Sequence, residues 1–208
     1  DLVHDVEIAS GREVNQSHFL YAKGKPYFAV QQTEKGQNQY LVFDLQNQVI
    51  VLFSESEKGE KTAQALPWVP ANNVIITANE NVHYPGVITQ TGQKKTIAGY
   101  VCDQYLAEDD DYHYELYTSP ELADYWQASM GQFMQRFTSY SYEEALQKIV
   151  GMPMESIASP KKNQNKPKLR LGKEQTPEID PNSDIWRVIK VDLSEFQLKK
   201  ADYPFFTP

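Results

Sequence analysis

Residues 95–121 constrain the fold most, because this segment encodes a β-hairpin that runs directly into the start of a helix. Residues 100–108 and 112–118 alternate in polarity as half-buried strands do, and an acidic turn separates them. Ser119 and Pro120 follow at once. Serine can accept hydrogen bonds from the free amides of a first helical turn, and proline fits the first helical position. The segment therefore predicts a sheet with one arm that delivers the chain into a helix.

Large apolar side chains then recur at three- and four-residue steps, which is the spacing of one helix face. This pattern predicts one long amphipathic helix at 122–137, lying on the sheet, and a shorter helix at 142–150. The apolar stripe has two interpretations. Core packing is the simpler one, and the other is the wall of a cavity for a lipid or an acyl chain. The residues that would line such a cavity are Tyr125, Trp126, Met130, Phe133, Met134 and Phe137.

The remaining strands are expected to form an antiparallel meander. Alternating runs predict them at 13–22, 27–32, 40–45, 49–54 and 185–193. The runs 40–45 and 49–54 carry apolar residues on both faces, so something is expected to cover each face of the sheet. The predicted fold class is therefore α+β. We expect residues 1–208 to form a single domain, with a flexible polar insert at 159–184 that is rich in Lys, Asn, Gln and Pro.

Composition disfavours several classes of protein. A net charge of -8 and a pI near 5.0 oppose a sequence-independent grip on nucleic acid, which depends on clustered Lys and Arg. No apolar run approaches the roughly 20 residues that a membrane-spanning helix requires. The single cysteine rules out an intramolecular disulfide. The sequence opens at Asp1 without a methionine, which fits either a removed signal segment or a boundary within a longer chain, so export is a hypothesis.

No pattern in the sequence predicts catalysis, a cofactor or a metal site. Cys102 has two interpretations, a reactive thiol or a packed core residue, and its place on a strand face favours the core. The acidic run 108–111 is better explained as a solvated turn than as a calcium site, because consecutive carboxylates at a hairpin tip cannot all turn inward. His113 and Glu115 share a strand face and are the nearest approach to an acid/base pair, but surface positions explain them better. We therefore expect a protein that is not an enzyme.

Short motifs connect the chain to a known family. The matching residues are Tyr21, Gly24, Phe43, Asp44, Leu45, Lys95, Thr96, Ile97, Gly99, Tyr100, Cys102, Tyr105, Gly151, Pro153 and Glu155. In their order and spacing the chain resembles an exported bacterial family, domain of unknown function 4412, which is similar to the outer-membrane lipoprotein carriers. The resemblance implies a curved antiparallel half-barrel packed on one long amphipathic helix plus a short helix. It also implies an exported protein, periplasmic or anchored to the outer membrane.

The expected function is non-catalytic binding of an apolar ligand, namely a lipid, an acyl chain or a lipoprotein, in the bacterial cell envelope. Peripheral or lipid-anchored membrane association accords with that expectation, and nucleic acid is not an expected partner. The alternative is a structural or protein-interaction module of the envelope with a filled core. Such a module would dock an envelope protein through a sheet edge or through the apolar tail 203–206.

Overall fold

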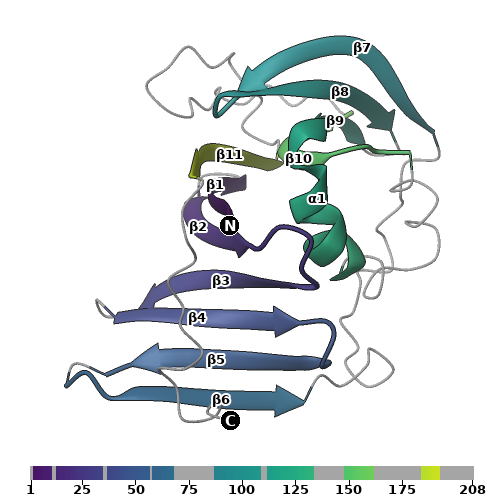
Figure 1. Ribbon diagram of the computed structural model, residues 1–208. Helices are drawn as coiled ribbons and strands as arrows, with labels where there is room; N and C mark the ends of the chain where they lie inside the picture. The colour runs from purple at the N-terminus through teal and green to yellow at the C-terminus, as the bar shows by residue number, and fades with distance from the viewer. Residues whose placement is uncertain are drawn as a thin grey trace.

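A computed structural model describes residues 2–10, 13–34, 37–56, 58–67, 87–108, 112–133, 148–161 and 184–192 of the protein. Strands dominate this part of the chain (Figure 1). They are β1 (Leu2–Ser10), β2 (Glu13–Tyr21), β3 (Tyr27–Glu34), β4 (Gln37–Asp44), β5 (Val49–Glu55), β6 (Lys61–Pro67), β7 (Ile88–Ile97), β8 (Tyr100–Glu108), β9 (Tyr112–Ser119), β10 (Met152–Pro160) and β11 (Asp184–Asp192).

The strands form one antiparallel sheet in the order β6-β5-β4-β3-β2-β1-β11-β10-β9-β8-β7. Strands β1 to β6 are a meander, since each pairs with its successor in the sequence. Strands β7 to β10 form the other end of the sheet, and β11 joins the two parts by pairing with β1 on one side and β10 on the other. The predicted antiparallel sheet is thus confirmed, and the described part of it is larger than the sequence indicated.

The predicted α+β class, a half-barrel packed on one long amphipathic helix plus a short helix, is wrong. The fold is mostly β, and the described helical segment covers only residues 120–133. It begins as a 3₁₀ turn, η1 (Pro120–Leu122), continues as α1 (Ala123–Trp126), and widens into a π-helical turn, η2 (Gln127–Gly131). A segment that changes its hydrogen-bonding pattern twice does not keep a spacing of 3.6 residues on one face, which is what the prediction assumed.

Several predictions lie wholly or largely outside the described residues. These include the end of the first predicted helix, most of the second helix at 142–150, the polar insert between 162 and 183, and the tail 203–206. Of the second predicted helix, Lys148 lies in a turn and residues 149–150 are irregular. Within the described ranges, no helix is long and apolar enough to cross a membrane.

Apolar side chains are buried on both faces of the sheet, as residues 40–45 and 49–54 predicted. One cluster contains Tyr21 and Phe28, with Phe43 packed against it. A second cluster is built by their neighbours in sequence, Leu20, Ala29 and Val42, together with Val51 and Phe53. Because successive strand residues point to opposite faces, these two sets lie on opposite sides of the sheet.

The helical segment crosses the face that carries the first cluster. Its beginning, η1, contacts β8 and β10, α1 contacts β10, and its end, η2, contacts β3. In the order of the sheet, β11, β1 and β2 lie between β10 and β3. The helical segment therefore passes over these three strands, as its path along the sheet in Figure 1 shows.

Candidate functional site

Three aromatic residues lie side by side on the face that the helical segment crosses. Tyr21 on β2 is the direct cross-strand partner of Phe28 on β3, which is in turn the partner of Phe43 on β4. The ring centroids are 6.3 Å apart for Tyr21 and Phe28 and 4.7 Å apart for Phe28 and Phe43, and both pairs are stacked. We call these three residues the aromatic row. Cross-strand aromatic pairs of this kind stabilise a sheet and present a continuous apolar surface.

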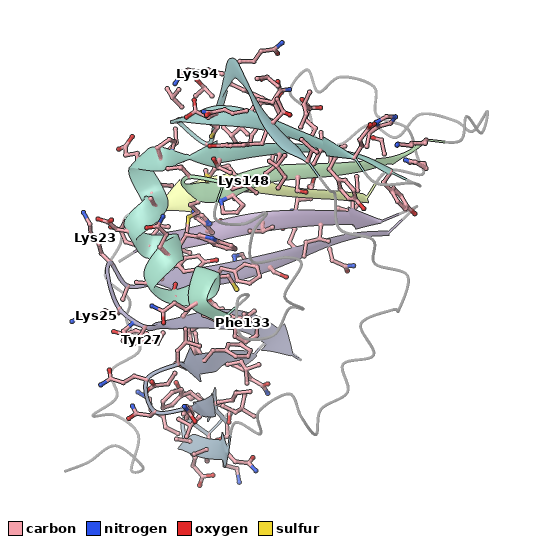
Figure 2. The ribbon with its side chains drawn as sticks, turned by 90° about the vertical axis from the view of Figure 1, so that its right-hand side faces the viewer. Lys23, Lys25, Tyr27, Lys94, Phe133 and Lys148 are labelled. Carbon is pink, nitrogen blue, oxygen red and sulfur yellow. The ribbon has the colours of Figure 1, made fainter. Side chains whose placement is uncertain are left out.

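Phe133 of the helical segment closes over one end of the aromatic row. Its ring stands nearly perpendicular to Phe28 and to Phe43, with 5.3 Å between centroids in each case. Figure 2 shows Phe133 at the lower end of the helical segment, beside the sheet. This edge-to-face geometry is a favourable arrangement for aromatic rings. The contact fixes where the helical segment meets β3 and β4.

The structure brings four of the six predicted cavity residues to this face. Each is partly buried and packs against the first apolar cluster: Tyr125, Trp126, Met130 and Phe133. The helix accommodates them closely, because a Cβ atom on Gly131 would lie 3.3 Å from the indole nitrogen of Trp126. The other two predicted residues, Met134 and Phe137, lie outside the described residues. Whether the four side chains contact a ligand stays a prediction.

His4 is a polar residue at an apolar position on the same face. It lies on β1 between Leu2 and Val6, which are both in the first cluster, and its ring meets Tyr21 edge-on at 5.4 Å. The residue is fully buried, and neither ring nitrogen has a hydrogen-bond partner among the described residues. Burial lowers the pKa of His4 from 6.5 to about 3, so the imidazole stays neutral at physiological pH.

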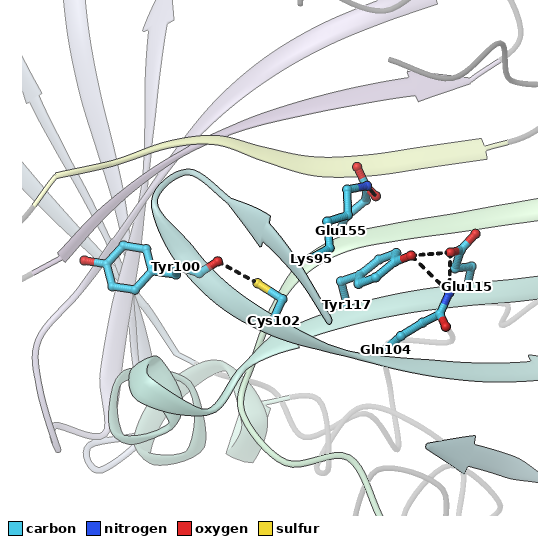
Figure 3. A network of polar contacts seen from close by, with 7 residues as sticks. All are labelled: Lys95, Tyr100, Cys102, Gln104, Glu115, Tyr117 and Glu155. Atoms are coloured by element: carbon cyan, nitrogen blue, oxygen red, sulfur yellow. Dashed lines mark hydrogen bonds and ion pairs between the residues drawn. The ribbon is translucent and has the colours of Figure 1, made fainter. Parts of the chain in front are cut away.

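A second group of polar side chains lies on one face of β7 to β10. Gln104 on β8 faces Tyr117 on β9, and Tyr117 faces Glu155 on β10. The Tyr117 hydroxyl donates to Glu115, and the Gln104 amide donates to both Glu115, at 2.6 Å, and the Tyr117 oxygen, at 3.0 Å (Figure 3). Thr91 donates to the Gln104 carbonyl at 2.6 Å. Within this group each of these side chains has a partner, which is what a buried polar network requires.

Lys95 and Glu155 form the ionic part of this group. The Glu155 side chain is fully buried and that of Lys95 is 37% exposed, and the two make an ion pair. The Lys95 ammonium also lies 4.7 Å from the centre of the Tyr117 ring, which is a cation–π contact. Burial, followed by the hydrogen bond to Glu115, raises the pKa of Tyr117. We call Thr91, Lys95, Gln104, Glu115, Tyr117 and Glu155 the polar cluster.

Local irregularities of the backbone position two members of the polar cluster. The pairing of β7 with β8 is interrupted between Gln90 and Lys94, where Thr91 lies, and that of β10 with β9 between Pro153 and Glu155. Bulges of this kind redirect side chains and are common beside functional sites. The irregularity in β7 explains how Thr91 comes within hydrogen-bonding distance of the Gln104 side-chain carbonyl, although β7 shows little alternation of polar and apolar residues.

Cys102 confirms the prediction of a packed core residue. Its side chain is fully buried, and its thiol donates to the Tyr100 carbonyl at 3.4 Å. Burial raises the pKa of Cys102 to about 11, so the thiolate is disfavoured. The thiol is therefore a structural group.

The burial of His4 was not predicted from the sequence. A signal was present, because His4 alternates with Leu2, Val6 and Ile8 in a period of two. The two acid/base candidates separate in the structure. His113 pairs with Glu108 at the surface, whereas Glu115 is half-buried in the polar cluster.

The described fold defines a class of protein: a large antiparallel sheet with a short helical segment crossing one face. The chain belongs to the family described as "Domain of unknown function (DUF4412)", whose sequence profile matches residues 70–177. The matched range includes the helical segment and every member of the polar cluster, whereas His4 and the aromatic row precede it. This confirms the family predicted from the motifs.

A comparison with curated protein sequences found no match. Among solved structures, the chain is similar to those titled "Structure of PNGF-II in C2 space group" and "Structure of PNGF-II in P21 space group". Both show 8% sequence identity and a TM-score of 0.32 over 92% of this chain. The chain spans only 27% and 28% of those two chains. A likeness this weak defines neither a fold nor a function.

Proposed function

We propose that the protein binds, without catalysing a reaction, an apolar ligand between the helical segment 120–133 and the sheet. The ligand class is a lipid, an acyl chain or the lipid-modified end of a lipoprotein. The protein would act in the bacterial cell envelope, exported and either periplasmic or anchored at the outer membrane. The localisation rests on the resemblance to an exported family and to the lipoprotein carriers.

One observation carries the proposal. Four large apolar side chains of the helical segment lie over the first cluster, yet each is only partly buried. The side chains beneath them are nearly inaccessible: Tyr21 and Phe28 are each 2% exposed. A ligand chain against the helical segment would cover the remaining apolar area, at a gain of about 25 cal/mol for each Å² removed from water.

The chemistry of the helical segment suits such a ligand. Met130 supplies a flexible, polarisable wall, and Trp126 and Phe133 supply large rigid ones. The π-helical turn lies among them, and turns of this type occur often at functional sites. The flexible methionine and the π-helical turn also accord with a binding surface that adapts to hydrocarbon chains of different length.

Native mass spectrometry of protein purified from its own host tests the proposal directly. We expect a lipid-sized adduct that is lost when the protein is extracted with organic solvent. A sample that never carries an adduct, and that also fails to bind a fluorescent long-chain fatty acid, would exclude a carrier. It would leave the interaction module as the explanation of the fold.

Two substitutions on the helical segment locate the site. Trp126→Ala removes a half-buried side chain over the first cluster, and we expect it to weaken fatty-acid binding about tenfold or more. Gln127→Ala is the matched control, because Gln127 is the next residue and is exposed. Equal effects of the two substitutions on binding would contradict a site beneath the helical segment.

A further inference from the structure

His4 is a buried polar residue whose chemistry its described surroundings leave unexplained. Both of its ring nitrogens are fully buried without a partner among the described residues. A neutral imidazole presents one N–H donor and one acceptor, and leaving a buried polar group unsatisfied typically costs about 1–3 kcal/mol. A residue that carries such a cost calls for a partner that the described part of the chain does not supply.

The position of His4 indicates where that partner lies. His4 is on β1, the middle one of the three strands that the helical segment passes over between β10 and β3. Its side chain is on the same face as Leu2 and Val6, within the first cluster, and its ring meets Tyr21 at one end of the aromatic row. A group that satisfies His4 would therefore enter beneath the helical segment, which must lift to admit it because His4 is 0% exposed.

We propose that His4 is the polar anchor of the apolar site, and that its imidazole hydrogen-bonds the hydroxyl or un-ionised carboxyl group of a long-chain amphiphile. This inference rests on the proposed function and specifies its ligand: one uncharged polar group at the inner end of a hydrocarbon chain.

The electrostatic surroundings select an uncharged polar group. The pKa of His4 is lowered to about 3, so the ring carries no charge to offset a buried carboxylate or phosphate. The cationic Lys95 is already engaged with Glu155 in the polar cluster. A charge brought beside His4 would lose its hydration without a counter-ion, which is costly in an apolar interior. A hydroxyl avoids that cost, because it can either donate to the imidazole or accept from it.

The aromatic residues next to His4 would provide the surface for the hydrocarbon chain once the helical segment lifts, since Tyr21 and Phe28 are each 2% exposed beneath it. The row continues from Tyr21 on β2 through Phe28 to Phe43 on β4, where Phe133 closes over it. From β1 to β4 there are three strand spacings, or about 14 Å in total. That length fits an extended alkyl chain better than a small solute.

Binding of matched amphiphiles tests the anchor. A long-chain alcohol, the fatty acid of equal length and the corresponding alkane are each used to displace a fluorescent apolar probe from the wild-type protein. We expect the alcohol to bind about tenfold more tightly than the alkane, and His4→Leu to remove that advantage while keeping alkane binding. His113→Leu is the control, since the side chain of His113 is 60% exposed on β9, and it should change neither.

The outcomes separate the two proposals. If the alcohol and the alkane bind the wild-type protein equally, or if His4→Leu weakens both equally, the anchor is wrong and the apolar site stands. If none of the probes binds the wild-type protein, the proposed function itself fails and the anchor fails with it. As a second measurement, the ring nitrogens of His4 should change their NMR chemical shifts on addition of the alcohol and not on addition of the alkane. Unchanged shifts with bound alcohol would overturn the anchor.

Discussion

Lys95 and Glu155 form an ion pair although two strands, β8 and β9, lie between theirs. On a flat sheet the two strands would be about 14 Å apart, and side chains that stand upright at that spacing do not meet. The pair closes because the long Lys95 side chain reaches across the ring of Tyr117 on β9. The ion pair therefore connects β7 directly to β10 across the two strands between them.

Removing the ammonium group of Lys95 should be strongly destabilising. Lys95→Met leaves the fully buried carboxylate of Glu155 without its counter-ion, and breaking one partner of a buried pair typically costs about 3–5 kcal/mol. Urea unfolding followed by circular dichroism measures the loss. Lys94→Met is the control: Lys94 is 63% exposed and pairs with Asp103 at 2.8 Å, so its loss should cost less than about 1 kcal/mol.

The double variant Lys95→Met with Glu155→Leu should recover much of the stability lost in Lys95→Met, because no uncompensated charge remains. If the double variant is as unstable as the single one, the effect comes from lost packing over Tyr117 instead of from the buried charge.

The unliganded protein should become more stable when His4 is replaced by leucine. The change removes a polar group that is buried without a partner and keeps an apolar side chain among Leu2, Val6 and Tyr21. We expect a gain of about 1–3 kcal/mol in the free energy of unfolding, measured on protein freed of ligand. A loss of stability on this substitution would show that water or another group already satisfies the ring.

His4 should also make the protein sensitive to acid. Its pKa is about 3 in the folded state against 6.5 for the ordinary imidazole, so between these values the unfolded chain binds the extra proton. Stability from this group is complete above about pH 6.5 and falls as the pH drops toward 3, by up to about 1.4 kcal/mol per pH unit. Unfolding curves at several pH values measure it. The difference in slope between wild-type and His4→Leu protein isolates the contribution, and parallel curves would contradict it.

Gly151 should tolerate no side chain. Its φ is +105°, and a Cβ atom there would lie 2.5 Å from the Ser119 carbonyl oxygen, so Gly151→Ala adds a backbone clash to the conformational strain. We expect a cost of roughly 3 kcal/mol or more, read from the thermal midpoint. Gly24→Ala is the matched control: its φ is +65° with no atom within 4 Å of the added Cβ, so only about 1–2 kcal/mol of strain is expected.

The thiol of Cys102 should react slowly in the native protein. It is fully buried, and its pKa is raised to about 11, so both access and thiolate content are low. A thiol reagent that yields a coloured product should label it only at the rate of unfolding. Labelling in denaturant should be complete within the mixing time, and fast labelling without denaturant would contradict the burial.

Strands whose side chains alternate strongly could be predicted from the sequence. The hairpin strand at 100–108 has the predicted bounds in the structure. Strands β1, β6, β7 and β10 were missed, although the side chains of β1 do alternate. In β7 only Ile97 is buried, so nothing in its polar sequence encodes a buried face. The length and regularity of the helix were overestimated, because the spacing of the large apolar residues within 122–133 is also compatible with a short segment of mixed helical type.

The polar cluster could not be predicted because its members come together through strand register. Lys95 and Glu155 are 60 positions apart and meet only because the pairing of β7 to β10 through β8 and β9 brings them to one face of the sheet. For Ser119 the predicted position was right and the predicted hydrogen bond was not. It does precede the helical segment as expected, but its hydroxyl makes no cap hydrogen bond there. Local sequence patterns predict where helices and strands begin and end. The register between strands that are distant in the sequence decides which side chains come into contact.

The central position of β11 has a consequence for how the protein is made. Its neighbours in the sheet are β1, about 180 positions earlier in the chain, and β10. While the ribosome extends the chain, the meander β1–β6 can assemble early, but its inner border waits for residues 184–192. Contacts over such separations are slow to form, because loop closure costs entropy before pairing repays it. In an unfinished chain, the backbone of β1 that later pairs with β11 is therefore exposed. Pairing of this edge with another strand at that stage would block the middle of the final sheet.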